Sequence, residues 1–263
     1  MNGNGRPSAT ANGLPSPSAN GRPAPLIRVR GLVKDFPLGK QMVRALDRVD
    51  FDVAAGEFLV IMGPSGSGKS TLLNLIGGLD RPTEGSIQVA GLEIGELDEI
   101  ALADYRRAFI GFVFQSFNLI GTMTARQNVE FPMVFAGRKP AERRKRAEAL
   151  LVEVGLGHRI EHRPIELSGG EQQRVAIARS LANGPHIVLG DEPTGNLDTK
   201  TGLEVLEILS RLNAAGKTVV VVTHDSRLTE YADRVVNMVD GRVQGEEVRQ
   251  EAGARQAAAA RKQ

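Results

Sequence analysis

A glycine-rich loop directly after a short apolar run constrains the fold of this chain more than any other feature. The run Phe58–Met62 is typical of a buried strand, and the loop after it, Gly63–Ser70 (GPSGSGKS), fills the pattern GxxxxGK[ST]. A helical run, Ser70–Gly77, comes next. A strand, a tight glycine loop and a helix in this order predict a phosphate-binding loop in an α/β nucleotide-binding sheet.

Each residue type in the loop suits the holding of phosphate. Glycines allow a tight turn whose backbone N–H groups face the phosphates, and the next helix adds its positive N-terminal end. We expect Lys69 to bridge the β- and γ-phosphates and the Ser70 hydroxyl to bind Mg²⁺. The residues predicted to bind nucleotide here are Gly63, Pro64, Ser65, Gly66, Ser67, Gly68, Lys69, Ser70 and Thr71.

Polar residues also follow three later apolar runs, where a doubly wound sheet builds its site. Asp191 is placed to hold Mg²⁺ through water, and Glu192 to polarise the attacking water as general base. His224 is placed to contact the γ-phosphate, and Gln115 to sense both Mg²⁺ and water. Alone, an acidic pair is more often a cap and a single His is more often structural. The glycine loop upstream reverses that preference for the acidic pair, and His224 differs from the other histidines because it lies at the end of an apolar strand.

A second glycine-serine turn lies at Leu167–Gln173 (LSGGEQQ). Its residues Ser168, Gly169 and Gly170 can open another helix onto phosphate. The nucleotide is therefore expected to be held from two sides.

Composition is that of an ordinary soluble protein. The chain has 263 residues and a formal net charge of +2, a surplus too small to indicate nucleic-acid binding. It has no cysteine, which excludes disulfides and thiolate metal sites. No window approaches the ~18–20 apolar residues of a membrane helix, and the N-terminus lacks the apolar core of a secretion signal. Any role at a membrane therefore requires a partner.

Two polar tails flank the predicted domain. Residues 1–25 are almost entirely Gly, Pro, Ser, Asn and Ala and are expected to be disordered, and residues 247–263 to be disordered or weakly helical. Residues 26–246 mix strands and helices, with a helix-rich stretch at roughly 100–185 that predicts an inserted helical subdomain. The other expected elements are strands at Leu26–Arg30, Phe51–Val53, Gly85–Ala90, Gly111–Phe114, His186–Leu189 and Thr218–Val222, and a helix at Ala141–Val154.

Together these motifs resemble those of the ATP-binding subunit of ABC transporters, over essentially all of residues 26–243. Five motifs occur in the family's order, which makes the resemblance specific. They are the Walker A loop (Gly63–Ser70), the Q-loop glutamine (Gln115), the family signature (Leu167–Gln173), Walker B with its catalytic glutamate (Ile187–Glu192) and the switch histidine (His224).

The resemblance assigns two further residues. Asp198 lies in Asn196–Asp198, which matches the D-loop that crosses between subunits. Phe36 occupies the place where the family stacks an aromatic ring, usually Tyr, on adenine, and stacking needs no hydroxyl. Gly190 departs from the small or apolar side chain normal for the family and leaves both carboxylates intact.

The resemblance implies an α/β fold with a P-loop NTPase core of the ABC type, in which a RecA-like mixed sheet carries an antiparallel β subdomain and an inserted α-helical subdomain. It also implies a head-to-tail homodimer that closes on ATP and opens on hydrolysis, because the phosphate loop of one subunit faces Ser168–Gly170 of the other. The stroke passes to integral-membrane permease subunits. This expectation places the chain peripherally on the cytoplasmic face of a bacterial inner membrane.

Details outside these motifs look like the macrolide-export and lipoprotein-release group (MacB/LolD type), and the cell-division relative FtsE shares part of the pattern. The segments that carry this likeness are Gly111–Leu119, Met123–Pro132, Ala136–Gly137 and Asp191–Asp198. Permeases of this group resemble mechanical devices with few membrane spans and a large outer domain. We expect residues 115–140 to contact the permease's cytoplasmic helix.

Two alternatives stay open at this point. One is an FtsE-like ATPase that regulates cell division or envelope remodelling instead of transport. The other is an ABC ATPase of translation or repair, but those relatives usually carry two cassettes, long coiled coils or zinc modules, and this chain has one cassette and no cysteine. The transported substrate is not encoded here, because substrate choice lies in the permease.

Overall fold

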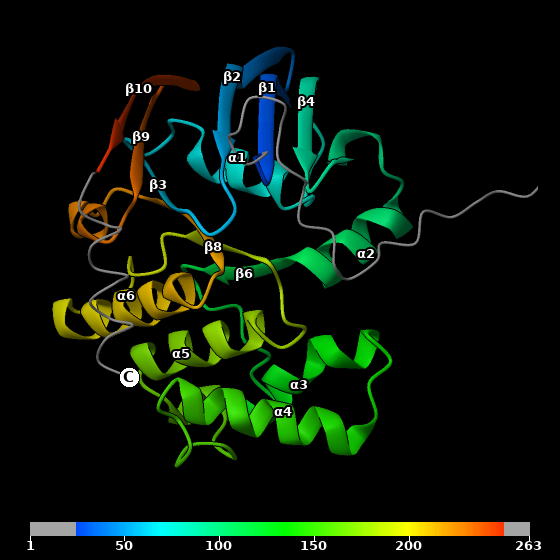
Figure 1. Ribbon diagram of the computed structural model, residues 1–263, viewed down its shortest axis with the longest axis vertical. Coiled ribbons are helices and arrows are strands. Elements are labelled where there is room, and N and C mark those ends of the chain that lie inside the picture. Colours follow the sequence, from blue (N-terminus) through cyan, green and yellow to red (C-terminus); the bar gives the residue numbers. More distant parts are fainter. Residues whose placement is uncertain (1–24, 250–263) are drawn as a thin grey trace, which may run out of the picture.

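The computed structural model describes residues 25–249, which form two β-sheets with helices packed around them (Figure 1). The strands are β1 (Ile27–Leu38), β2 (Gln41–Val53), β3 (Phe58–Met62), β4 (Glu84–Val89), β5 (Leu92–Glu93), β6 (Ile110–Phe114), β7 (Ile187–Asp191), β8 (Thr218–Thr223), β9 (Arg234–Val239) and β10 (Arg242–Val248). The α-helices are α1 (Lys69–Ile76), α2 (Glu99–Phe109), α3 (Ala125–Phe135), α4 (Pro140–Glu153), α5 (Gly169–Ser180) and α6 (Thr199–Ala214). Short 3-10 turns are η1 (Ile94–Glu96), η2 (Pro164–Glu166) and η3 (Ser226–Glu230).

The two sheets have different topologies. An antiparallel four-stranded sheet, order β2-β1-β4-β5, lies at the top of Figure 1. The second sheet has six strands in the order β10-β9-β3-β8-β7-β6. The strands β9, β3, β8, β7 and β6 are parallel to one another, and only β10 pairs antiparallel with its neighbour β9. A mixed sheet with an antiparallel subdomain confirms the predicted fold class.

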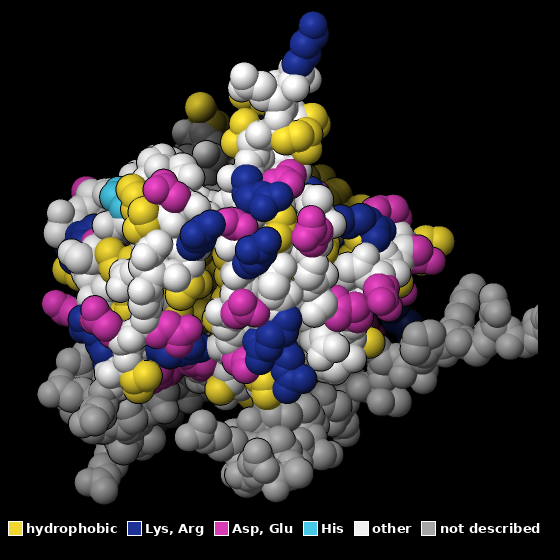
Figure 2. Space-filling view, turned by 90° about the horizontal axis from the view of Figure 1, so that it is seen from above, with side chains coloured by type: hydrophobic (Ala, Val, Ile, Leu, Met, Phe, Trp, Pro, Cys, Tyr) yellow, Lys and Arg dark blue, Asp and Glu magenta, His cyan; other side chains and the backbone are white. Residues whose placement is uncertain are grey.

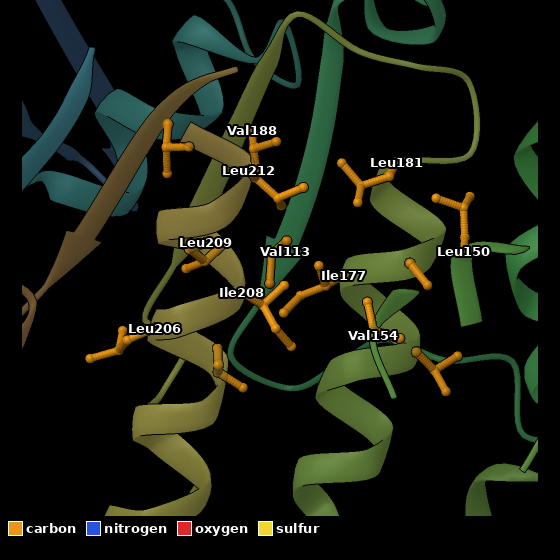
Figure 3. Close-up of a cluster of buried hydrophobic side chains, with 14 of the residues drawn as sticks. Val113, Leu150, Val154, Ile177, Leu181, Val188, Leu206, Ile208, Leu209 and Leu212 are labelled. Atoms are coloured by element: carbon orange, nitrogen blue, oxygen red, sulfur yellow. The ribbon is translucent and has the colours of Figure 1, made fainter. Parts of the chain in front are cut away.

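Alternate residues of β3 supply two separate cores. Phe58 and Val60 pack with residues of α3 to α6, whereas Leu59 and Ile61 pack with the antiparallel sheet, α1 and α2. Burial on both faces explains why this strand is a continuous apolar run without alternation. Figure 3 shows part of the first core, where side chains of α5 and α6 converge on strand residue Val113.

Strand lengths differ from the sequence prediction mainly in the first hairpin. The strand β3 coincides with the predicted run Phe58–Met62. However, β1 and β2 are far longer than the predicted Leu26–Arg30 and Phe51–Val53. Register shifts interrupt their pairing, for example between Val29 and Leu32, and each shift breaks the alternation on which the prediction depended.

The helix-rich stretch predicted at roughly 100–185 contains α3, α4 and α5, which lie together at the bottom of Figure 1. The same stretch also contains β6, a strand of the six-stranded sheet, and most of α2, which packs into the second core. The subdomain boundary therefore stays a prediction. At the C-terminal end, β10 continues to Val248, past the predicted start of the tail. The predicted tails otherwise lie outside the described residues.

The surface above the antiparallel sheet carries charges of both signs, interspersed in Figure 2. Several are paired on neighbouring strands: Arg44 lies 2.9 Å from Asp35, and Arg242 pairs with Asp47. Exposed pairs like these contribute little to stability, but they neutralise the basic residues locally. Among the described residues, no helix is both long enough and apolar enough to cross a membrane.

Candidate nucleotide site

The glycine loop joins β3 to α1, and its backbone requires glycine. Gly68 directly precedes the helix with a left-handed φ of 93°. A Cβ at Gly68 would also lie 2.4 Å from the carbonyl oxygen of Ala45. Both the dihedral angle and the close approach of the β2 backbone therefore exclude a side chain at this position.

A cleft of about 610 Å³ opens over this loop. Its lining combines loop residues with polar residues from the carboxyl ends of β6, β7 and β8. These residues are Ala45, Ser65, Gly66, Gly68, Lys69, Ser70, Thr71, Gln115, Asp191, Glu192 and His224. The structure therefore brings together the loop and the four strand-end residues that the sequence analysis singled out. Ala45, from β2, was not predicted.

Lys69 and Ser70, the residues expected to bind phosphate and Mg²⁺, hydrogen-bond to other residues of the cleft and its loop. The Lys69 ammonium is buried and donates to the carbonyl oxygens of Gly63 and Pro64, at 2.8 and 2.9 Å. The Ser70 hydroxyl donates to Asp191 Oδ1 at 2.8 Å. Burial raises the pKa of Asp191 despite this hydrogen bond. A poorly solvated carboxylate beside a hydroxyl is a donor set that fits Mg²⁺.

Glu192 has a left-handed φ of 47°, which is costly for a residue with a side chain. Its N–H donates to the carbonyl oxygen of Val222 at 2.9 Å. Its carboxylate accepts a hydrogen bond from Thr223 Oγ1 at 3.0 Å and lies 3.0 Å from His224 Nδ1. These contacts hold the strained residue. Thr223 was not predicted, although it is a polar residue at the same strand end as His224.

Gln115 is tied to the segment that follows β7. The Asn196 side-chain amide donates to the Gln115 carbonyl oxygen at 3.0 Å, and the Gln115 amide donates to Asn196 Oδ1 at 3.4 Å. A Cβ at Gly195 would lie 2.8 Å from Gln115 Nε2, so a side chain there would require the Gln115 amide to move. These contacts connect Gln115 to the segment that carries Asp198.

Other predicted nucleotide contacts lie outside the cleft lining. Phe36 is 38% exposed on the first hairpin, where the Lys34 ammonium lies 4.8 Å from its ring centre. Asp198 and Ser168 are the N-cap residues of α6 and α5. Ser168, Gly169 and Gly170 are not among the residues that line the cleft of their own chain. Gly63, Pro64 and Ser67 belong to the loop without lining the cleft, and the buried Ser67 hydroxyl has no hydrogen-bond partner within residues 25–249.

The parallel sheet, the glycine loop with its facing carboxylates and the antiparallel subdomain together define a P-loop ATPase of the ATP-binding cassette class. The family model described as "ABC transporter" matches residues 46–195, more than half of the chain. The chain belongs to the ABC transporter family and is an ABC ATPase.

Close relatives cover most of the chain. The macrolide export ATP-binding/permease protein MacB of Acinetobacter baylyi is 51% identical over 218 residues, which are 83% of this chain and 33% of the relative. An uncharacterised ABC transporter ATP-binding protein of Thermotoga maritima is 53% identical over 82% of this chain and 92% of the relative. The chain thus spans about a third of the length of the MacB relatives.

Solved structures show the same fold. The dimeric structure of MJ0796, described as a bacterial ABC transporter cassette, is 48% identical, with a TM-score of 0.80 over 84% of this chain and 98% of that one. A second structure of the same cassette, 47% identical and also with a TM-score of 0.80, is a dimeric post-hydrolysis state bound to ADP and Pi.

Proposed function

We propose that this chain is the ATP-hydrolysing subunit of a transport complex of the MacB/LolD type and energises a separate integral-membrane permease in export, lipoprotein release or mechanotransmission. The convergence of Lys69, Ser70, Asp191 and Glu192 in one cleft is the observation that carries the proposal. The MacB relatives support the transport class, since their name joins an ATP-binding part to a permease.

The residues of the cleft divide the chemistry among them. Ser70, Asp191 and Gln115 would hold Mg²⁺, which supplies positive charge to the phosphates. Lys69 exchanges the carbonyl oxygens of Gly63 and Pro64 for the β- and γ-phosphates. Glu192 accepts a proton from the attacking water. His224 contacts the Glu192 carboxylate and orients this carboxylate toward the γ-phosphate.

The second phosphate-facing turn serves a partner subunit. Ser168–Gly170 begin α5 and lie outside the cleft of their own chain. A helix N-terminus with two glycines is suited to an anion. In a head-to-tail homodimer this turn completes the partner's γ-phosphate site, while Asp198 and Phe36 contact nucleotide from the D-loop and the first hairpin. The dimeric state of MJ0796 supports this arrangement.

A groove of about 560 Å³ between α2, β6, α3 and α5 is the proposed seat of the permease's cytoplasmic helix. Its lining includes the apolar rings of Phe112, Phe114 and Phe135, with Arg106 and Arg179 beside them. Phe135 is 65% exposed. An apolar helix face that carries a carboxylate would complement this lining. The groove adjoins Gln115, so occupancy can influence the nucleotide cleft.

The Glu192→Gln variant tests the hydrolytic part of the proposal. We expect it to bind ATP, to elute as a dimer in the presence of ATP and Mg²⁺, and to lose roughly 100-fold or more in turnover. The exposed Glu153→Gln on α4 is the matched control and should hydrolyse ATP normally. Near-normal turnover of Glu192→Gln would remove the general-base assignment.

Purification of the chain with its membrane partner tests the transport part. A permease with few spans and a large outer domain that exports or releases a substrate supports the proposal. A division protein as the partner would favour the FtsE-like alternative, in which the same cleft and groove regulate cell division or envelope remodelling.

A further inference from the structure

Gln173 is a completely buried polar residue that the scheme above does not use. It lies in α5, one turn after Ser168–Gly170. Its amide nitrogen donates to the carbonyl oxygen of Pro193 at 2.6 Å, whereas its amide oxygen has no partner among the described residues. An apolar side chain of similar volume would avoid the cost of burying an unpaired oxygen. The contact with Pro193 is what a glutamine provides here.

Pro193 directly follows the strained Glu192. A left-handed conformation is unfavourable for a residue with a side chain, and the proline that follows restricts it further. Such strain persists only where surrounding contacts fix it. The Glu192 carbonyl oxygen accepts a hydrogen bond from Gly195 N at 3.0 Å, and Gln173 fixes the next carbonyl. The Gln173–Pro193 hydrogen bond is therefore one of the contacts that direct the Glu192 side chain into the cleft.

The first turn of α5 is packed against the same segment. A Cβ at Gly169 would lie 3.7 Å from the Leu197 side chain, and one at Gly170 would lie 1.9 Å from Thr201 Cγ2. At Gly170, α5 is therefore in direct contact with the first turn of α6. Movement of the α5 N-terminus is therefore transmitted to the chain that follows Glu192.

We propose that Gln173 is a positioning residue that holds Glu192 in its strained conformation and connects the two ATP sites of the dimer. The inference rests on the proposed function, in which Ser168–Gly170 bind the partner's nucleotide and Glu192 acts on the chain's own. When the N-terminus of α5 binds the partner's nucleotide, the Gln173–Pro193 hydrogen bond connects this binding event to the position of Glu192, the general base of the chain's own site.

The Gln173→Leu variant removes the hydrogen bond and keeps a similar volume. We expect kcat to fall about 10- to 100-fold, because small misplacements of a reacting group are costly. The affinity of the monomer for nucleotide should stay within about twofold of the wild-type value. The Hill coefficient for ATP should fall to about 1. Normal kcat would overturn the positioning role, and a lower kcat with unchanged cooperativity would overturn the connection between sites.

The Gln173→Glu variant gives a second readout if Gln173→Leu folds poorly. A glutamic acid of the same shape donates to Pro193 only when it is protonated. The ratio of its kcat to the wild-type kcat should therefore fall as pH rises, and taking the ratio removes any pH dependence that both proteins share. A ratio that does not change with pH would overturn the proposal.

Arg174→Gln is the matched control. Arg174 follows Gln173 in the chain and joins α5 to Glu204 of α6 at 2.7 Å, without contacting Pro193. This variant loosens α5 elsewhere, so it should retain kcat and cooperativity. Equal losses in Arg174→Gln would mean that any weakening of α5 suffices. Activity that survives in Glu192→Gln would contradict the proposed function itself, a result distinct from failure of the Gln173 variants.

Discussion

The Ser70 hydroxyl and the Asp191 carboxylate, 2.8 Å apart, join two strands that are not neighbours in the sheet. Ser70 belongs to the loop and helix that follow β3, Asp191 ends β7, and β8 lies between these strands. The hydrogen bond therefore spans the carboxyl end of β8, where Ser70 and Asp191 together would bind a metal ion. The two proposed metal ligands are thus in direct contact with each other.

Asp191→Asn is expected to stabilise the nucleotide-free protein while preventing its stabilisation by ATP and Mg²⁺. Because burial raises the pKa of Asp191 in the folded state, the folded carboxyl binds its proton more tightly than the unfolded one. The resulting stability is complete below the unfolded-state pKa and is lost as pH rises through the folded-state pKa. At neutral pH the buried charge therefore destabilises the fold.

Urea unfolding without nucleotide measures this effect. The midpoint of Asp191→Asn should equal or exceed that of the wild type at neutral pH, and the difference should shrink toward acid pH. A wild type that is clearly more stable than the variant at neutral pH would contradict the prediction.

Ser168→Arg should abolish hydrolysis and leave ATP binding by the monomer within about twofold of the wild type. A long cation at the start of α5 blocks the face that the partner's nucleotide needs, while the chain's own cleft lies elsewhere. Fluorescent-nucleotide titration and phosphate release measure the two effects. If monomer binding fell as much as hydrolysis, the turn would act within its own chain and the dimer proposal would be wrong.

Gly170→Ala should destabilise the protein by about 1–3 kcal/mol, the usual cost of overpacking. The new methyl group would lie 1.9 Å from Thr201 Cγ2, and the next Thr201 atom is 3.3 Å away. Adding Thr201→Ser removes the closest atom and should recover most of the lost stability. Thermal or urea unfolding of the single and double variants checks this. Strictly additive effects would show that the contact is not the cause.

Tyr105→Phe should cost about 1–2 kcal/mol of stability without changing turnover. The buried Tyr105 hydroxyl donates to the carbonyl oxygen of Ile76 at the end of α1, at 2.7 Å, and the variant leaves this oxygen without its partner. Because α2 carries the tyrosine, the hydrogen bond ties α2 to the helix that follows the phosphate loop. Urea unfolding measures the loss, and a steady-state ATPase assay is its control.

The parts of the fold and site that the sequence predicts well share a local cause. The glycine loop needs left-handed backbone and close approach, so its spacing alone identifies it. Buried parallel strands are apolar throughout, and a polar residue at their end is conspicuous. Asp191, Glu192, His224 and Gln115 were found in this way, and the structure places all four on one cleft.

Features that escape the sequence depend on contacts between distant segments. Gln173 is one polar residue on a mostly polar helix turn, and only the packing of α5 against the chain after β7 reveals its burial. Ala45 lines the cleft because β2 passes over Gly68, which no local pattern indicates. The strand β10 was missed because it is largely exposed and polar.

The six-stranded sheet separates two hydrophobic cores that share no buried side chain among the described residues. One core supports α3 and α5, two of the helices that border the groove, whereas the other supports the antiparallel sheet and α2, the third helix of the groove. A substitution that changes side-chain volume in one core thus alters packing on one face of the sheet only. The loss of stability that it causes should not involve residues of the other core. The helices α3 and α5 can then diverge in sequence, or be redesigned for another partner, while the half of the molecule that contains the first hairpin keeps its packing.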